Sequence, residues 1–108
     1  MKTRREQIED VIREAITAFP RTNYDEVMSP RRYRYIVKAR WAAMAAVKVA
    51  FPSLSLPHIG RIFGRDHSTV LHAQKQLNDL RSTDPKLEAR VQEWETFFSQ
   101  RKPTKGAS

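Results

Sequence analysis

Four consecutive polar residues, Asp66 to Thr69, carry the side chains best suited to chemistry in this chain of 108 residues. A carboxylate can accept a hydrogen bond from the amino group of cytosine, and a hydroxyl can bond to a base or to a phosphate. An imidazole such as that of His67 can donate, accept or pack against a thymine methyl group. A simpler interpretation is that Asp66 only caps a helix and that His67 is merely exposed. From the residues alone, this simpler interpretation is the more common one.

The histidines and glycines do not have the spacing of an enzyme or a metal site. His58, His67 and His72 do not form a zinc pattern such as H-E-x-x-H, and no nucleophile is placed recognisably beside a base. None of the three glycines begins the G-x-x-x-x-G-K-[ST] pattern of a phosphate-binding loop. We therefore expect no catalytic activity, no metal, no cofactor and no bound nucleotide.

The net charge of +8 is concentrated in the middle of the chain. Residues 31–81 hold ten basic and two acidic side chains, whereas the segments on either side are close to neutral. A concentrated basic surface attracts polyanions such as nucleic acids, although a basic surface can also serve solubility alone. The chain has no cysteine and shows no apolar signal segment or membrane-spanning stretch. We therefore expect a cytoplasmic, nucleoid-associated protein without a membrane partner.

Apolar residues recur at helical spacing along nearly the whole chain, without any strand pattern. The pattern predicts helices over about 4–19, 35–51 and 55–63, a short turn of helix over 25–28, and two further helices that begin after Asp66 and Asp84. The two helices around Gly64 are typical of a helix–turn–helix over residues 55–81. We expect an all-α fold of five to six helices in one domain, residues 1–100, followed by a disordered tail, residues 101–108.

Small and apolar residues indicate how these helices pack. Six alanines in the 35–51 helix allow close packing, and Gly60 leaves room for another helix to approach. Two apolar stripes are expected to face the core: Val70, Ala73, Leu77 and Leu80 on one helix, and Leu87, Val91, Trp94 and Phe98 on the other.

The run IGRIFGRDHSTVLHA, residues 59–73, resembles the signature of the C-terminal DNA-binding domain of the bacterial replication initiator DnaA. That signature reads approximately I-G-x-x-F-G-G-R-D-H-[ST]-T-V-x-H-A. The resemblance continues upstream through SLP (55–57) and VKARWAAM (37–44), and it covers about residues 5–98. It implies a helix–turn–helix fold of the DnaA C-terminal or Trp-repressor type. It also makes the base-reading interpretation of Asp66 and His67 the favoured one.

The resemblance implies DNA-contacting roles for eleven residues. Those implied to contact bases are Asp66, His67, Ser68 and Pro57 in the major groove and Arg32 in the adjacent minor groove, which is narrow in A/T-rich DNA. Those implied to contact the DNA backbone are Arg40, Lys48, Thr69, Arg65, Arg31 and Arg34. Arg31 and Arg34 flank Arg32 and could take its place in the groove.

The sequence departs from the family pattern at several positions. Gly64 stands alone where the family usually has two glycines, and we expect a shortened turn rather than a rotated helix. Ser68 stands where threonine is commoner, and His58 replaces a glutamate that would complete a capping box. Trp41 replaces a glutamine, and we expect it to pack into the core.

Together these features predict a sequence-specific double-stranded DNA-binding protein. We expect it to recognise a DnaA-box-like site, to regulate transcription or replication, and to stand alone without the ATPase module of the full initiator. One alternative is a non-specific DNA binder. Another is a protein-interaction module that docks an unidentified partner through the first helix and the aromatic last helix, with Trp94, Phe97 and Phe98.

Overall fold

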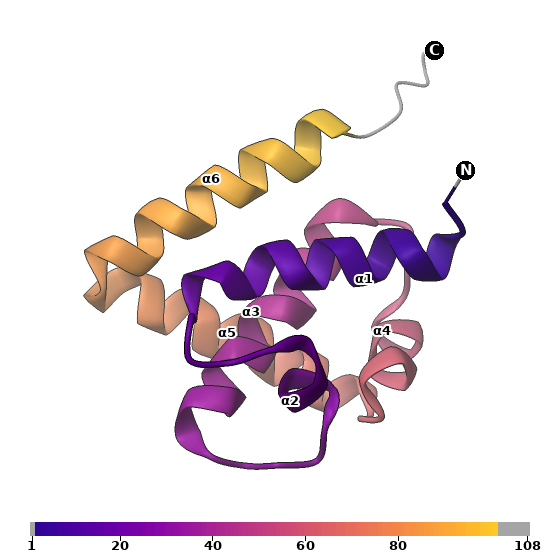
Figure 1. Ribbon diagram of the computed structural model, residues 1–108, viewed down its shortest axis with the longest axis horizontal. Helices are drawn as coiled ribbons and strands as arrows, with labels where there is room; N and C mark the ends of the chain where they lie inside the picture. Colours follow the sequence, from indigo (N-terminus) through magenta and orange to yellow (C-terminus); the bar gives the residue numbers. More distant parts are fainter. Residues whose placement is uncertain (1, 102–108) are drawn as a thin grey trace.

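The computed structural model describes residues 2–101, which form the bundle of helices in Figure 1. Its elements are α1 (Arg4–Ala15), the 3-10 helix η1 (Ile16–Ala18), α2 (Tyr24–Met28), α3 (Arg34–Ala50), α4 (Leu56–Phe63), α5 (His67–Thr83) and α6 (Pro85–Arg101). No strand occurs in residues 2–101, and the expected all-α class is confirmed. Of the expected tail, Arg101 is the last residue of α6, and the remainder lies outside the described residues. Within the described range, no helix has the length and apolar character needed to cross a membrane.

The first α-helix ends earlier than the apolar pattern predicts. It begins with a capping box, in which the Thr3 hydroxyl accepts from the Glu6 N–H and the Glu6 carboxylate accepts from the Thr3 N–H. The helix stops at Ala15 and tightens into η1, and Phe19 then leaves helical geometry with a φ of −129°. The cause is Pro20, because the ring of a proline disfavours the α conformation in the residue before it.

The third α-helix, α3, lies at the centre of the molecule and packs against α1, α2, α5 and α6. Its alanines at 39, 42, 43 and 46 are fully buried, as are Met44 and Val47. Added methylene groups along this helix would cost about 1–3 kcal/mol each through overpacking. Trp41 is only half-buried at the edge of this core. Its ring contacts the ring of His72 edge-on, with 6.0 Å between the two ring centroids. The expectation that Trp41 packs into the core is therefore confirmed only in part: the ring contacts the core but is not buried in it.

The expected helix–turn–helix is formed by α4 and α5. Ser55 caps α4, since its hydroxyl accepts from the His58 N–H at 3.2 Å. Gly64 ends α4 in the left-handed conformation with a φ of +69°, which glycine adopts without strain. Asp66 then caps α5. Ser55, Gly64 and Asp66 therefore begin or end these helices through contacts within a few residues of the chain, as the sequence predicts.

The apolar stripes of α5 and α6 face the core as predicted. The buried residues are Val70, Ala73, Leu77, Leu87, Val91, Trp94 and Phe98, and Leu80 is partly buried. A slip of one residue would have rotated α5 by about 100°. Because the stripe faces inward, the turn with its single glycine leaves α5 correctly phased. The predicted cap of α6 is also present, since Asp84 Oδ1 accepts from the Leu87 N–H at 3.2 Å.

Gly60 makes room for the turn rather than for another helix, which corrects the expectation from the sequence. A Cβ atom at Gly60 would lie 2.4 Å from the carbonyl oxygen of Arg65 and 3.1 Å from the carbonyl carbon and oxygen of Asp66. The Arg65 N–H also donates to the Gly60 carbonyl at 2.7 Å. The turn thus folds back onto α4, and this contact holds the N-terminus of α5 close to α4.

Candidate nucleic-acid interface

The predicted base-reading residues form the N-cap and first turn of α5. Asp66 Oδ1 accepts three hydrogen bonds, from Ser68 Oγ at 2.6 Å, the Thr69 N–H at 3.1 Å and Thr69 Oγ1 at 3.2 Å. The bond from Ser68, followed by that from the Thr69 amide, lowers the pKa of Asp66. Because a carboxylate has two oxygens with about four acceptor sites, capping does not prevent a contact with a base. The two interpretations of Asp66 are therefore compatible.

This first turn is presented to solvent. His67 and Ser68 are exposed, and Thr69 is half-buried. The amides at the start of a helix have no intrahelical acceptor and favour an anion such as phosphate. Pro57 is exposed as well, and it lies near the start of α4, the helix that packs against α5. The arrangement suits a surface that inserts into a groove.

A second exposed basic segment connects α2 to α3. We call residues 29–33 the arginine loop; it runs along the lower edge of the molecule in Figure 1. Arg31, Arg32 and the adjoining Arg34 are all exposed. Sequence reasoning missed Tyr33, which is 61% exposed and stacks on Tyr35 with 6.2 Å between ring centroids. In the sequence it stands between Arg32 and Arg34.

Arg40 does not have the exposed position that its implied phosphate contact requires. Its side chain is 5% exposed and lies against the arginine loop. Nε donates to the Val27 carbonyl at 2.8 Å, while Nη2 donates to the Ser29 and Arg31 carbonyls at 2.7 and 2.9 Å. In this structure the guanidinium is therefore a bridge between α3 and the loop.

Two other residues with implied backbone contacts also bind carbonyls of the protein. Lys48 Nζ donates to the carbonyls of Pro52 and Leu54 at 3.0 and 2.8 Å, so it closes the connection between α3 and α4. Arg65 is half-buried, and its Nη2 donates to the Ser29 carbonyl at 3.4 Å. Their charges remain close to the surface, but their geometry is set by the fold.

The basic middle of the chain lacks internal neutralisation. The ion pairs of residues 2–101 involve Lys2, Arg13, Arg81 and Arg90 as the cations. The nine basic residues between positions 31 and 75 make no ion pair within that described range. Burial, and then the charges of Arg65 and Arg32, lower the pKa of Arg40 to about 10. Guanidinium groups therefore lie close together beside the arginine loop without forming an ion pair in the described part of the chain.

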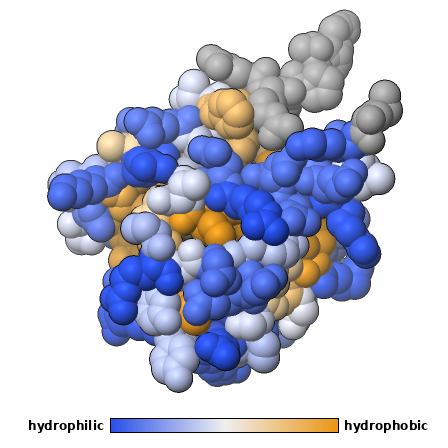
Figure 2. All heavy atoms as spheres, in the orientation of Figure 1, coloured by the Kyte–Doolittle hydropathy of each residue, from blue (hydrophilic) through white to orange (hydrophobic). Residues whose placement is uncertain are grey.

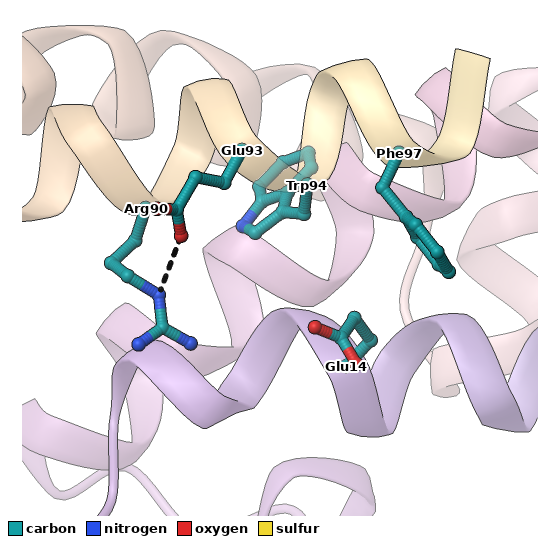
Figure 3. Close-up of a pocket in the computed structure, with 5 residues that line it drawn as sticks. All are labelled: Glu14, Arg90, Glu93, Trp94 and Phe97. Atoms are coloured by element: carbon teal, nitrogen blue, oxygen red, sulfur yellow. Dashed lines mark ion pairs between the residues drawn. The ribbon is translucent and has the colours of Figure 1, made fainter. Parts of the chain in front are cut away.

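The surface proposed for a protein partner lies elsewhere, between α1 and α6. A hollow of about 230 Å³ lies there, lined by Glu14, Arg90, Glu93, Trp94 and Phe97, whose side chains are drawn in Figure 3. Arg90 Nε pairs with Glu93 Oε1 at 3.5 Å, and the ring of Phe97, which is 49% exposed, lies at the rim. Figure 1 places α6 across the upper part of the molecule, away from the arginine loop.

Figure 2 shows hydrophilic residues over most of one face, with smaller hydrophobic areas between them. Among residues 2–101, no three histidine, aspartate or glutamate side chains lie together in a way that could hold a metal ion.

Comparison with known proteins agrees with the geometry. The family described as "Bacterial dnaA protein helix-turn-helix" matches residues 8–77. The chain is 45% identical over 87 residues to the chromosomal replication initiator protein DnaA of Agrobacterium fabrum, and 43% identical over 90 residues to that of Rhizobium meliloti. These alignments cover 80% and 82% of this chain but 18% of each relative.

A shorter alignment is more similar still: the Brucella abortus DnaA protein is 52% identical over 63 residues, which is 57% of this chain and 12% of the relative. No solved structure gives a significant match. The segment that matches the family, residues 8–77, contains α4 and the first part of α5, including the exposed first turn of α5 and its cap. By the family match and these relatives, the chain belongs to the family of bacterial DnaA helix–turn–helix domains.

Proposed function

We propose that this chain binds double-stranded DNA in a sequence-specific manner at a DnaA-box-like site and regulates transcription or replication. The observation that carries the proposal is a set of nine basic residues without ion-pair partners in residues 2–101, two of which, Arg31 and Arg32, lie on the exposed arginine loop, together with the exposed, capped first turn of α5. Such charges are neutralised by phosphates, and bound DNA releases its counterions in exchange. The names of the relatives, chromosomal replication initiator proteins, agree with a role on DNA.

In this proposal the two exposed segments divide the recognition of DNA. Asp66, His67 and Ser68 contact base edges in the major groove, where the donor and acceptor pattern is specific. The arginine loop contacts the adjacent minor groove through Arg32, which favours narrow A/T-rich sequence. Thr69 and the basic residues other than Arg40 contact the backbone and fix the register of the protein on the duplex. The protein then works on the nucleoid in the cytoplasm.

A titration tests the proposal. Fluorescence anisotropy would compare a labelled duplex carrying a DnaA-type box, a duplex with the same bases scrambled, and single-stranded DNA, at two salt concentrations. We expect the box duplex to bind most tightly, because base contacts add to the phosphate contacts. Equal affinity for box and scrambled duplex would leave a non-specific binder, and failure to bind either duplex would refute DNA binding.

A matched pair of variants assigns the site. His67→Ala is expected to reduce the preference for the box over the scrambled duplex by about 1–3 kcal/mol, roughly 5- to 150-fold. Phe97→Ala changes an exposed aromatic residue on α6 and is expected to leave both affinities unchanged. The opposite result, with His67→Ala silent and Phe97→Ala harmful, would place the binding surface between α1 and α6 instead.

A further inference from the structure

We infer that Arg40 is a positioning residue for DNA recognition: it holds the arginine loop in register with α5 and acts on DNA through that loop. The inference rests on the proposed function and deepens it. It replaces a direct phosphate contact of Arg40 by an indirect role, so the two alternatives predict different behaviour in binding experiments.

The first step is the set of carbonyls that surround the guanidinium. Arg40 donates to the Val27, Ser29 and Arg31 carbonyls at 2.7–2.9 Å, and its Nη2 lies 3.4 Å from the Glu26 carbonyl. The Glu26 and Val27 carbonyls belong to α2, a helix of five residues. The Glu26 carbonyl already accepts from the Ser29 N–H at 3.1 Å, so the bonds through which Arg40 holds this segment are those to Val27, Ser29 and Arg31. The planar fork of a guanidinium carries five N–H donors in fixed directions. One side chain thus fixes the backbone path from the end of α2 to Arg31.

The second step is a connection between the loop and the turn before α5. The Ser29 carbonyl accepts from Arg40 Nη2 at 2.7 Å and from Arg65 Nη2 at 3.4 Å. Arg65 lies between Gly64 and Asp66, in the turn that precedes α5. A single carbonyl oxygen therefore receives donors from α3 and from the helix–turn–helix. This shared acceptor links the arginine loop to the first turn of α5, although the two segments are far apart in sequence.

The third step is that Arg32 depends on this arrangement. Its neighbour Arg31 contributes a carbonyl to Arg40, so the backbone immediately before Arg32 is fixed. The Arg32 side chain is exposed, whereas that of Arg40 is buried and occupied. Like charges lie close together here, since Arg65 and Arg32 both lower the pKa of Arg40, and the carbonyl bonds hold the loop in place against that repulsion. Arg40 is buried under the loop, and Arg32 is the side chain that reaches outward.

A double-mutant cycle tests the inference. Arg40→Met, Arg32→Ala and the double variant would be titrated against box duplexes flanked by A/T or by G/C pairs. If Arg40 acts through the loop, both single variants lose the preference for A/T flanks, and the double variant loses no more than either one within about twofold. If Arg40→Met weakens both duplexes by the same factor, and adds its full effect to that of Arg32→Ala, Arg40 contacts phosphate directly and the inference is wrong.

The conservative variant and the unaltered protein provide independent readouts. Arg40→Lys keeps the positive charge but lacks the planar guanidinium with its several donors. It should therefore lose the preference for A/T flanks as Arg40→Met does. If lysine restored that preference fully, the guanidinium would not be needed to hold the loop, and the inference would be wrong. In the unaltered protein, nuclear magnetic resonance should find the Arg40 Nε–H protected from hydrogen exchange, because it is buried and bonded to Val27. Rapid exchange would overturn the inference even if Arg40→Met fails to fold.

These outcomes separate the inference from the proposed function. If the unaltered protein prefers no duplex, the proposed function fails while the protection of the Arg40 Nε–H can still be measured. If the unaltered protein recognises the box but the cycle is additive, only the role of Arg40 is refuted.

Discussion

Gly60→Ala tests the close contact that positions α5. The new Cβ would lie 2.4 Å from the Arg65 carbonyl oxygen, an atom of the backbone that no side-chain rotation can move away. To bring this Cβ and the Arg65 oxygen to an ordinary contact distance of about 3.5 Å, the turn would have to shift by roughly 1 Å. Overpacking of this kind costs up to about 3 kcal/mol, and the better helix propensity of alanine offsets about 1 kcal/mol. We expect a loss of about 2 kcal/mol in the free energy of unfolding, or a fall in Tm of roughly 8–16 °C for a domain of this size.

Thermal unfolding followed by circular dichroism measures this loss, with Gly64→Ala as the matched control. Gly64 has open space around it, so alanine there costs only the left-handed strain of about 1–2 kcal/mol. Displacement of α5 by roughly 1 Å should also weaken box binding at temperatures where Gly60→Ala is fully folded. A Gly60→Ala protein as stable as the unaltered one would refute the proposed packing of the turn against α4.

Three further results are expected. With about five phosphates neutralised, the logarithm of the association constant for the box duplex should fall against the logarithm of salt concentration with a slope near −4 to −5, and a flat dependence would contradict phosphate binding. Asp66→Ala should lower Tm, because it removes the side-chain oxygen that accepts from the Thr69 N–H at the start of α5. Asp66→Asn keeps such an oxygen and should lower Tm less. Equal falls in Tm for the two variants in circular dichroism melts would contradict the capping role of Asp66. Arg81 lowers the pKa of Glu88, so this pair stabilises the fold above the usual carboxyl range and loses that effect as pH falls through the lowered value. In urea unfolding, Arg81→Met should therefore have a lower free energy of unfolding than the unaltered protein near neutral pH, and this difference should shrink below about pH 4. A difference that stays constant with pH would refute the stabilising role of the pair.

The sequence was sufficient wherever a feature depends on neighbours a few residues away. Ser55, Gly64 and Asp66 mark helix ends because a hydroxyl or carboxylate reaches an amide three residues later, or because a left-handed residue ends the helix. The core stripes of α5 and α6 follow from helical periodicity in the same way. Phe19 was misassigned because apolar spacing continues up to Pro20, while the proline already restricts the residue before it.

The contacts with DNA remain predictions for all eleven residues, but the structure divides them into different kinds. Asp66, His67 and Ser68 share one exposed turn, and Arg31, Arg32 and Arg34 share another exposed segment. Arg40 and Lys48 instead have most of their donors committed to carbonyls of the protein. A pattern of residue types cannot make this distinction, because it contains no information on where backbone carbonyls turn toward a buried cation.

By itself, the sequence determined an all-α chain, the start of α5 after its cap, the phase of α5 and the excess of positive charge in residues 31–81. Each of these is set by local periodicity, capping or composition. Only the tertiary structure decided that Gly60 accommodates the turn and that Arg40 and Arg65 meet at the Ser29 carbonyl. The physical reason is that those contacts join backbone atoms of segments separated in the chain. Their partners become defined only when α2, α3 and the turn before α5 have packed together.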